Sequence, residues 1–139
     1  MKTRKTPLQT SLPESLQTKQ PNTELKRGDI YYADLNGLEH ARGSEQTGRR
    51  PVLIIQNDIA NRCAPTTIVA ILTSKRKRYM PTHVPLHDFA GLIRESVVCL
   101  EQIKTIDKSR LEDYKGNVGA KAMKKIEKAL MISLGADGA

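Results

Sequence analysis

The sequence predicts a mainly β protein, a small closed or half-closed barrel followed by one C-terminal helix. Two observations lead to this fold class. Short apolar runs rich in β-branched residues recur between residues 30 and 106, and apolar residues recur at helical spacing only near the C-terminus. A chain of 139 residues has room for one ordinary domain. Five or more short strands protect their edges best when the sheet curls toward closure.

The first predicted strand is Ile30–Leu35, which lies between Gly28 and the turn signal Asn36-Gly37. Two continuous apolar runs follow, at residues 52–55 and 68–72. Both are rich in β-branched residues and too short to form independent helices, which is typical of central strands.

The segment between these two runs, residues 58–65, reads as a connection. A further strand is predicted at residues 83–87, where Pro85 favours an edge position because proline cannot donate a ladder hydrogen bond. Residues 96–100 form the next predicted strand, and residues 102–106 continue it.

The C-terminal segment changes to helical spacing. Its apolar residues are Met123, Ile126, Leu130 and Leu134, lysines occupy the other sides, and Gly135 is a stop signal. We expect Met123 and Leu130 to pack on the sheet.

Residues 1–24 are predicted to form a flexible arm before a domain at residues 25–139. The arm is rich in Thr, Ser, Gln, Pro and Lys, and such a composition buries too little apolar surface to offset the entropy lost on ordering. Leu8, Leu12 and Leu16 are four residues apart, so a short docking helix is the alternative.

Charge and composition narrow the classes of protein. Lys and Arg outnumber Asp and Glu by 23 to 15, for a net charge of +8, which favours a polyanionic partner such as nucleic acid. Cys63 and Cys99 are far apart, with no Cys-x-x-Cys or clustered His, so we expect no disulfide, metal site or cofactor. Without an apolar run of ~20 residues or a signal peptide, the chain is predicted to be cytoplasmic, with no membrane partner.

A set of motifs points to a family. They are Gly43-Ser44-Glu45-Gln46, Arg50-Pro51-Val52-Leu53 and Gln56-Asn57-Asp58, with later matches at Pro65-Thr66, Ile71-Leu72-Thr73, Pro81-Thr82-His83-Val84 and residues 99–107. With them, residues 25–134 closely resemble the MazF/PemK toxins of bacterial toxin-antitoxin systems. The resemblance implies an SH3-like (MazF/CcdB-like) β-barrel and a homodimer. It also implies a sequence-specific, metal-independent endoribonuclease that cuts single-stranded RNA and is blocked by a MazE-like antitoxin with an acidic, partly disordered tail.

Three residues are the candidates for catalysis. Arg50 offers a planar fork of donors that stays charged, which suits stabilisation of a phosphoryl transition state. Thr73 ends the strand at residues 68–72, and its family counterpart places a hydroxyl at the scissile phosphate or the attacking 2′-oxygen. Glu45 is either a base for the 2′-hydroxyl proton or a loop anion that holds Arg49 or Arg50. Arg49 is the weaker candidate because neighbouring strand residues face opposite sides.

The RNA-binding candidates come from four segments that the family resemblance implies, and most are polar or basic side chains, which can contact the base edges and backbone of a single strand. They are Ser44, Gln46, Lys75, Arg76, Pro81, Thr82, Glu101 and Gln102.

Paired histidines are the other common way to cleave RNA. However, His83 and His87 would lie about 13 Å apart along one strand, which is too far to serve a single phosphate. Two other functions also remain open: a barrel toxin that inhibits DNA gyrase by protein-protein binding, and an RNA-binding module without turnover.

Overall fold

The computed structural model describes residues 24–37, 48–74, 80–87, 89, 91–92 and 95–138. Its elements, in chain order, are β1 (Asp29–Asp34), β2 (Arg49–Ile54), α2 (Asp58–Cys63), β3 (Thr66–Thr73), β4 (His83–Leu86), β5 (Ser96–Asp107), a 3-10 turn (Lys108–Arg110), β6 (Leu111–Asn117) and α3 (Gly119–Leu134). The predicted mainly β class with a C-terminal helix is confirmed.

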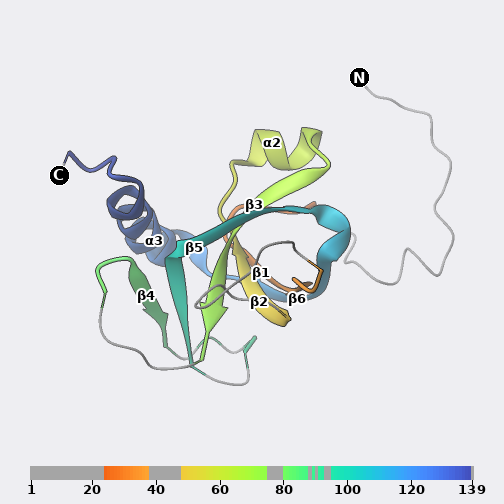
Figure 1. The fold of residues 1–139 in the computed structure, drawn as a ribbon, viewed down its shortest axis with the longest axis horizontal. Helices are drawn as coiled ribbons and strands as arrows, with labels where there is room; N and C mark the ends of the chain where they lie inside the picture. Colours follow the sequence, from red (N-terminus) through yellow and green to blue (C-terminus); the bar gives the residue numbers. More distant parts are fainter. Residues whose placement is uncertain are drawn as a thin grey trace, which may run out of the picture.

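The six strands form one antiparallel sheet in the order β4-β5-β3-β2-β1-β6. β5 is 12 residues long and arches across the sheet, while α3 lies beside β4 and β5 (Figure 1). The sheet is therefore a curled half-barrel with β4 and β6 at its edges. This is the half-closed barrel that the sequence predicted as one of two forms. Pro85 lies in β4, so its predicted edge position is confirmed.

The two faces of the sheet carry separate apolar cores. The first core lies under α3, where Met123, Ile126 and Ala129 pack with residues such as Leu53, Leu72 and Leu100. The second core fills the inside of the curl, and its members include Tyr31, Val52, Ile54, Val69 and Ile71. Because both faces are buried, the central strands are apolar on both sides, which explains their continuous apolar runs.

Two segments differ from the sequence prediction. Residues 58–63, read as a connection, form a short helix that begins where the Asn57 side chain accepts a hydrogen bond from the Ala60 N–H. β6 was not predicted, because Leu111 is its only buried residue and the strand lacks an apolar run. β6 is an edge strand that pairs only with β1, so it needs little apolar surface.

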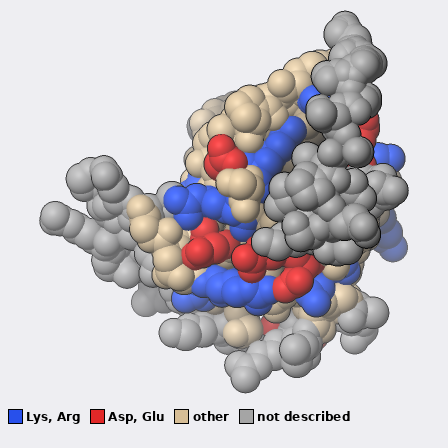
Figure 2. All heavy atoms as spheres, turned by 90° about the vertical axis from the view of Figure 1, so that its right-hand side faces the viewer, with Lys and Arg blue, Asp and Glu red and all other residues tan. Residues whose placement is uncertain are grey.

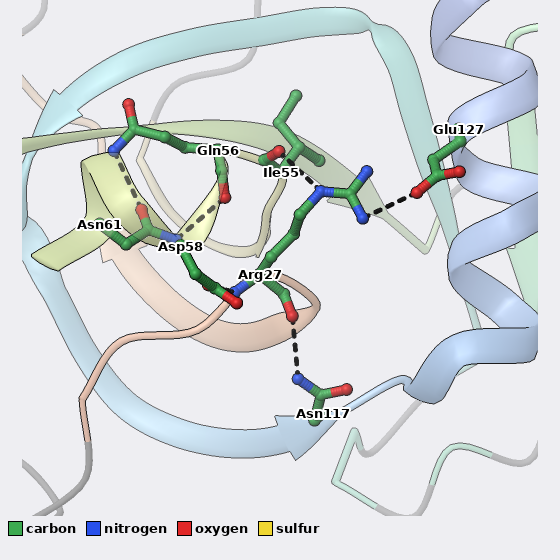
Figure 3. Close-up of polar contacts among 7 residues, drawn as sticks. All are labelled: Arg27, Ile55, Gln56, Asp58, Asn61, Asn117 and Glu127. Carbon is green, nitrogen blue, oxygen red and sulfur yellow. Dashed lines mark hydrogen bonds and ion pairs between the residues drawn. The ribbon is translucent and has the colours of Figure 1, made fainter.

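Arg27 connects the start of the domain to four other parts of the fold, and Figure 3 shows its contacts with Ile55, Glu127 and Asn117. Its Nε donates to the Ile55 carbonyl at 3.2 Å, and its Nη1 lies 2.8 Å from the Glu127 carboxylate in α3. The Arg27 carbonyl accepts from Asn117 at 3.2 Å, and its N–H donates to Asp58 at 2.7 Å. The N-terminal entry to β1 is thus held against β2, α2, β6 and α3 together.

Asn61 is the buried polar centre of α2. Its Oδ1 accepts from the Thr67 hydroxyl at 2.8 Å and from the Gln56 side chain at 3.0 Å, and its Nδ2 donates to the Gln56 carbonyl (Figure 3). Asn61 is 3% exposed and Thr67 is fully buried. These bonds join α2 to the start of β3.

Replacing Asn61 by Ala is expected to lower the free energy of unfolding by about 1–3 kcal/mol, because the buried Thr67 hydroxyl would lose its acceptor. Urea unfolding of the variant beside Asn36→Ala, a change at an exposed position, measures the difference. Equal midpoints for the two variants would contradict a structural role for the Asn61 bonds.

Tyr31 in the second core predicts a loss of stability at alkaline pH. Burial, aided by Asp29 and Tyr114, raises the pKa of Tyr31 to about 12, whereas an unfolded chain releases this proton near pH 10. The stabilisation is therefore fully present below about pH 10 and is lost as pH rises toward 12, by roughly 1.4 kcal/mol per pH unit.

Tyr31→Phe, which cannot ionise, is expected to lose less stability than the wild type between pH 10 and pH 12. Denaturant unfolding of both proteins across this range measures the two slopes. Parallel curves would show that the Tyr31 proton is not linked to folding.

Candidate active site

Arg50 and Thr73 meet at one end of two central strands. β2 and β3 pair antiparallel, with Val52 opposite Ile71. The same register, carried two residues further along each strand, sets Arg50 opposite Thr73, and opposite residues share a face of the sheet. The face is that of the second core, and the pair lies at its end, where β2 begins and β3 ends.

The two side chains differ in exposure. Thr73 is 3% exposed and Arg50 is half-buried. A hollow of about 350 Å³ opens at the same strand ends, and its lining includes both Arg49 and Arg50, with Tyr32, Ser74 and Ser96, but not Thr73. Both arginines therefore border the hollow, whereas Thr73 does not.

Arg49 points the other way, as predicted from its place beside Arg50 in the strand. Its Nε donates to Glu112 at 2.9 Å, a second nitrogen pairs with Asp113, and its guanidinium lies 4.4 Å from the centre of the Tyr32 ring. The hydrogen bond to Glu112, more than any other contact, raises the Arg49 pKa above its ordinary value. Arg49 is thus engaged by β6 and β1 and is held away from Arg50's face.

A bulge in β6 brings these acidic residues to Arg49. β6 pairs with β1 through Gly116 opposite Ile30 and then Glu112 opposite Tyr32, so the register shifts between the two pairs. Within the shift, Asp113 has a φ of 48°, a left-handed conformation that Asp tolerates better than most residues. The sequence signal for this contact is weak, because Glu112 and Asp113 lie more than 60 residues from Arg49.

Thr82 and Glu101, both predicted to contact RNA, are bonded to each other. The Thr82 hydroxyl donates to Glu101 Oε1 at 2.8 Å, and His83 Nε2 lies 2.9 Å from Oε2. Burial alone would raise the pKa of Glu101, but the hydrogen bonds from His83 and Thr82 outweigh it and hold the pKa below its usual value. Glu101 is therefore an anion held in a fixed orientation.

The remaining predicted site residues divide into two groups. Pro81 is exposed and adjoins Thr82 in the chain, and Gln102 is half-buried and adjoins Glu101. Ser44, Glu45, Gln46, Lys75 and Arg76 lie outside the described residues. Their placement at the site stays a prediction.

The histidines do not form a pair. His83 contacts Glu101, whereas His87 contacts Glu95 at 3.0 Å. Each has its own carboxylate partner, which agrees with the expectation that they do not serve one phosphate. The sequence did not indicate a further grouping: His83, Cys99 and Glu101 come together on one face.

The charge on one side of the molecule is mixed. Figure 2 shows Lys and Arg interspersed with Asp and Glu on the face that it presents. The net charge of +8 is thus not gathered there as a single basic patch. None of the helices in the described ranges is long and apolar enough to cross a membrane.

A family model described as "PemK-like, MazF-like toxin of type II toxin-antitoxin system" matches residues 26–134. The chain belongs to this family. The predicted resemblance is therefore confirmed over nearly the whole of the described fold.

Two curated relatives agree with this membership in the PemK/MazF family. Endoribonuclease EndoA of Bacillus subtilis is 51% identical over 112 residues, covering 79% of this chain and 94% of the relative. Endoribonuclease MazF of Staphylococcus saprophyticus is 46% identical over 113 residues, covering 80% and 92%.

Solved structures agree with this membership and with the fold. A mycobacterial endoribonuclease in complex with its cognate antitoxin is 32% identical, with a TM-score of 0.67, and the match covers 80% of this chain and 95% of that one. MazF from Deinococcus radiodurans has a TM-score of 0.69 at 23% identity, over 82% of this chain and 99% of that one, and shows the shared fold. The predicted MazF-like barrel is confirmed by these neighbours.

Proposed function

We propose that this PemK/MazF-family toxin is a sequence-specific endoribonuclease that cuts single-stranded RNA, including mRNA, without a metal ion. The attacking group is the RNA's own 2′-hydroxyl, and the products carry a 2′,3′-cyclic phosphate and a 5′-hydroxyl. Cleavage of mRNA stops translation and therefore growth. The observation that carries the proposal is the antiparallel register of β2 and β3, by which Arg50 at the start of β2 and Thr73 at the end of β3 fall at the same end of the sheet. The relatives named as endoribonucleases support the same activity.

The two residues divide the chemistry. During 2′-hydroxyl attack, negative charge grows on the non-bridging oxygens of the phosphate, and the Arg50 guanidinium can donate two hydrogen bonds to them. The Thr73 hydroxyl both donates and accepts, so it orients the 2′-hydroxyl or the phosphate. Glu45 stands as either the base that takes the 2′-hydroxyl proton or the anion that positions an arginine.

The bases on either side of the cut are read by polar groups near Glu101. Glu101 is oriented by Thr82 and His83 and accepts hydrogen bonds from base amino groups. Gln102 follows Glu101 and Pro81 precedes Thr82 in the chain, and the same role is proposed for Ser44, Gln46, Lys75 and Arg76.

An antitoxin with an acidic, partly disordered tail blocks the enzyme by occupying the surface that binds RNA. An acidic peptide can do so because it carries a series of negative charges, as the RNA backbone does. The mycobacterial relative solved with its cognate antitoxin supports this partner. We further propose that the toxin acts as a homodimer in the cytoplasm, where its mRNA substrate lies.

The test is to incubate the purified protein with a long, weakly structured RNA in excess EDTA, and to map every new end together with its chemistry. We expect cuts at one short sequence, with cyclic phosphate and 5′-hydroxyl ends. Cuts that need added metal would contradict the metal-independent mechanism. Intact RNA from a folded preparation would overturn the ribonuclease function and favour gyrase inhibition or passive RNA binding.

A further inference from the structure

Three side chains with metal-binding atoms meet on the sheet face that carries Arg50 and Thr73. They are His83 from β4 and Cys99 and Glu101 from β5, and their ligand atoms all lie within 4.8 Å of one another. No other such group of three or more occurs among the residues that the structure places. Ile71 and Thr73 pair with Cys99 and Val97, so the group lies two strands from Arg50.

The pairing of β4 with β5 brings these side chains together. His83 lies opposite Cys99. The Leu100 N–H donates to the Thr82 carbonyl at 2.9 Å, so Thr82 and Leu100 form a hydrogen-bonded pair. Hydrogen-bonded and non-hydrogen-bonded pairs alternate along an antiparallel ladder, so the adjacent pair, His83 and Cys99, is non-hydrogen-bonded. Side chains approach most closely across non-hydrogen-bonded pairs, and Glu101 is the next residue of β5 on the same face.

The chemistry of the three groups selects a class of cation. A thiolate, an imidazole and a carboxylate suit borderline ions such as Zn²⁺ and Co²⁺, whereas Mg²⁺ and Ca²⁺ prefer oxygen ligands alone. Zinc bonds of 2.0–2.3 Å place tetrahedral ligands roughly 3.3–3.8 Å apart, so small side-chain rotations would close the present spacing. We propose that His83, Cys99 and Glu101 bind one Zn²⁺-class divalent cation, with water as the fourth ligand.

The surroundings suit this role. Cys99 is 4% exposed, whereas the side chains of His83 and Glu101 are 10% and 30% exposed, so the ion enters from the Glu101 side. The Thr82 hydroxyl holds Oε1 of Glu101 and directs Oε2 toward His83. Such a supporting hydrogen bond orients a ligating carboxylate. On binding, the ion replaces the His83–Glu101 hydrogen bond, and the Cys99 thiol releases its proton to solvent.

Binding has a consequence for RNA, which rests on the proposed function. A cation held by Glu101 takes away the carboxylate that accepts from base amino groups. The ion itself is not part of the cleavage chemistry, which Arg50 and Thr73 perform. Zn²⁺ is therefore expected to inhibit cleavage while leaving the fold unchanged.

The direct test is a Co²⁺ titration of the full, tag-free chain under reducing conditions, followed by displacement with Zn²⁺. The wild type is expected to bind one Co²⁺ per chain and to develop the near-ultraviolet absorption of a thiolate bound to cobalt. Cys63→Ser, which removes the exposed cysteine, is the matched control and should behave as the wild type. Cys99→Val should lose the thiolate absorption, and Co²⁺ affinity should fall more than roughly tenfold.

Glu101→Gln and His83→Gln change less buried side chains than Cys99→Val does, so they are expected to disturb the fold less. Each should also weaken Co²⁺ binding. The absence of thiolate absorption in the wild type, or its retention in Cys99→Val, would overturn the site. A loss in Cys63→Ser would assign the metal to the other cysteine and overturn it as well.

A second experiment separates the site from its consequence. Zn²⁺ is added to an RNA cleavage reaction with the wild type and with Cys99→Val, and excess EDTA is added afterwards. We expect inhibition of the wild type alone, reversed by EDTA. If the wild type binds Zn²⁺ yet cleaves at an unchanged rate, the link between the site and RNA is wrong. If the metal-free protein does not cleave at all, the proposed function fails while the Co²⁺ result still decides the site.

Discussion

Arg50→Ala is expected to lower the rate of RNA cleavage by on the order of 10²- to 10³-fold, the usual cost of removing one donor to the charge of a transition state. Arg50 lies at the start of β2, at the end of the sheet where β3 ends in Thr73, and we expect its guanidinium to contact the scissile phosphate. The measurement is the single-turnover rate on a short RNA that contains the mapped cleavage sequence, together with the dissociation constant for an uncleavable 2′-deoxy analogue. Binding should change much less than the rate.

The matched control is the neighbouring arginine. Arg49→Ala removes contacts with Glu112, Asp113 and Tyr32 on the opposite face, so cleavage should stay near the wild-type rate. The Arg49 side chain is 46% exposed, and exposed ion pairs contribute only about 0–1 kcal/mol to stability. Equal losses of rate in the two variants would contradict the assignment of catalysis to one face.

Ile126→Ala is expected to lower the free energy of unfolding by about 2–5 kcal/mol, because it leaves a cavity between α3 and the sheet. Ile126 is fully buried in the first core, whose other members come from α3 and from β1 to β5. A loss of this size is a large share of the roughly 5–15 kcal/mol that stabilises an ordinary domain. Urea unfolding followed by circular dichroism measures it.

Met131→Ala lies on the same helix with its side chain 46% exposed, and it should cost much less. If the two variants unfold at the same urea concentration, α3 does not seal the first core. The RNA cleavage rate of Ile126→Ala below its unfolding transition should stay close to the wild-type rate, since Arg50 and Thr73 lie on the other face.

Much of the fold could be predicted because the signals are local. The apolar runs of β2 and β3 and the helical spacing of Met123, Ile126 and Leu130 each fall within one element. β6 escaped prediction because an edge strand with mostly exposed residues carries little apolar pattern. α2 escaped because six residues are too few to show a helical period.

The candidate site likewise has a part that local sequence signals predict and a part that they do not. The opposite faces of Arg49 and Arg50 follow from strand geometry alone, and the choice of Arg50 came from the family motif. The meeting of His83 with Cys99 and Glu101 depends on the register of β4 against β5, across 16 and 18 residues of chain. No local pattern encodes such a register, so the sequence predicted two unrelated thiols and no metal site.

The adjacent arginines give the start of β2 an unusual sensitivity to register. Both faces of this strand are apolar, so a slip by one residue would exchange Val52 and Ile54 for Leu53 and Ile55 at little hydrophobic cost. The same slip would turn Arg50 toward the acidic residues of β6 and bring Arg49 to the face of the proposed RNA site. The contacts of Glu112 and Asp113 with Arg49 therefore favour the register in which Arg50, the proposed catalytic residue, lies on the face of the second core, and the pairing of β2 with β1 and β3 holds the same register.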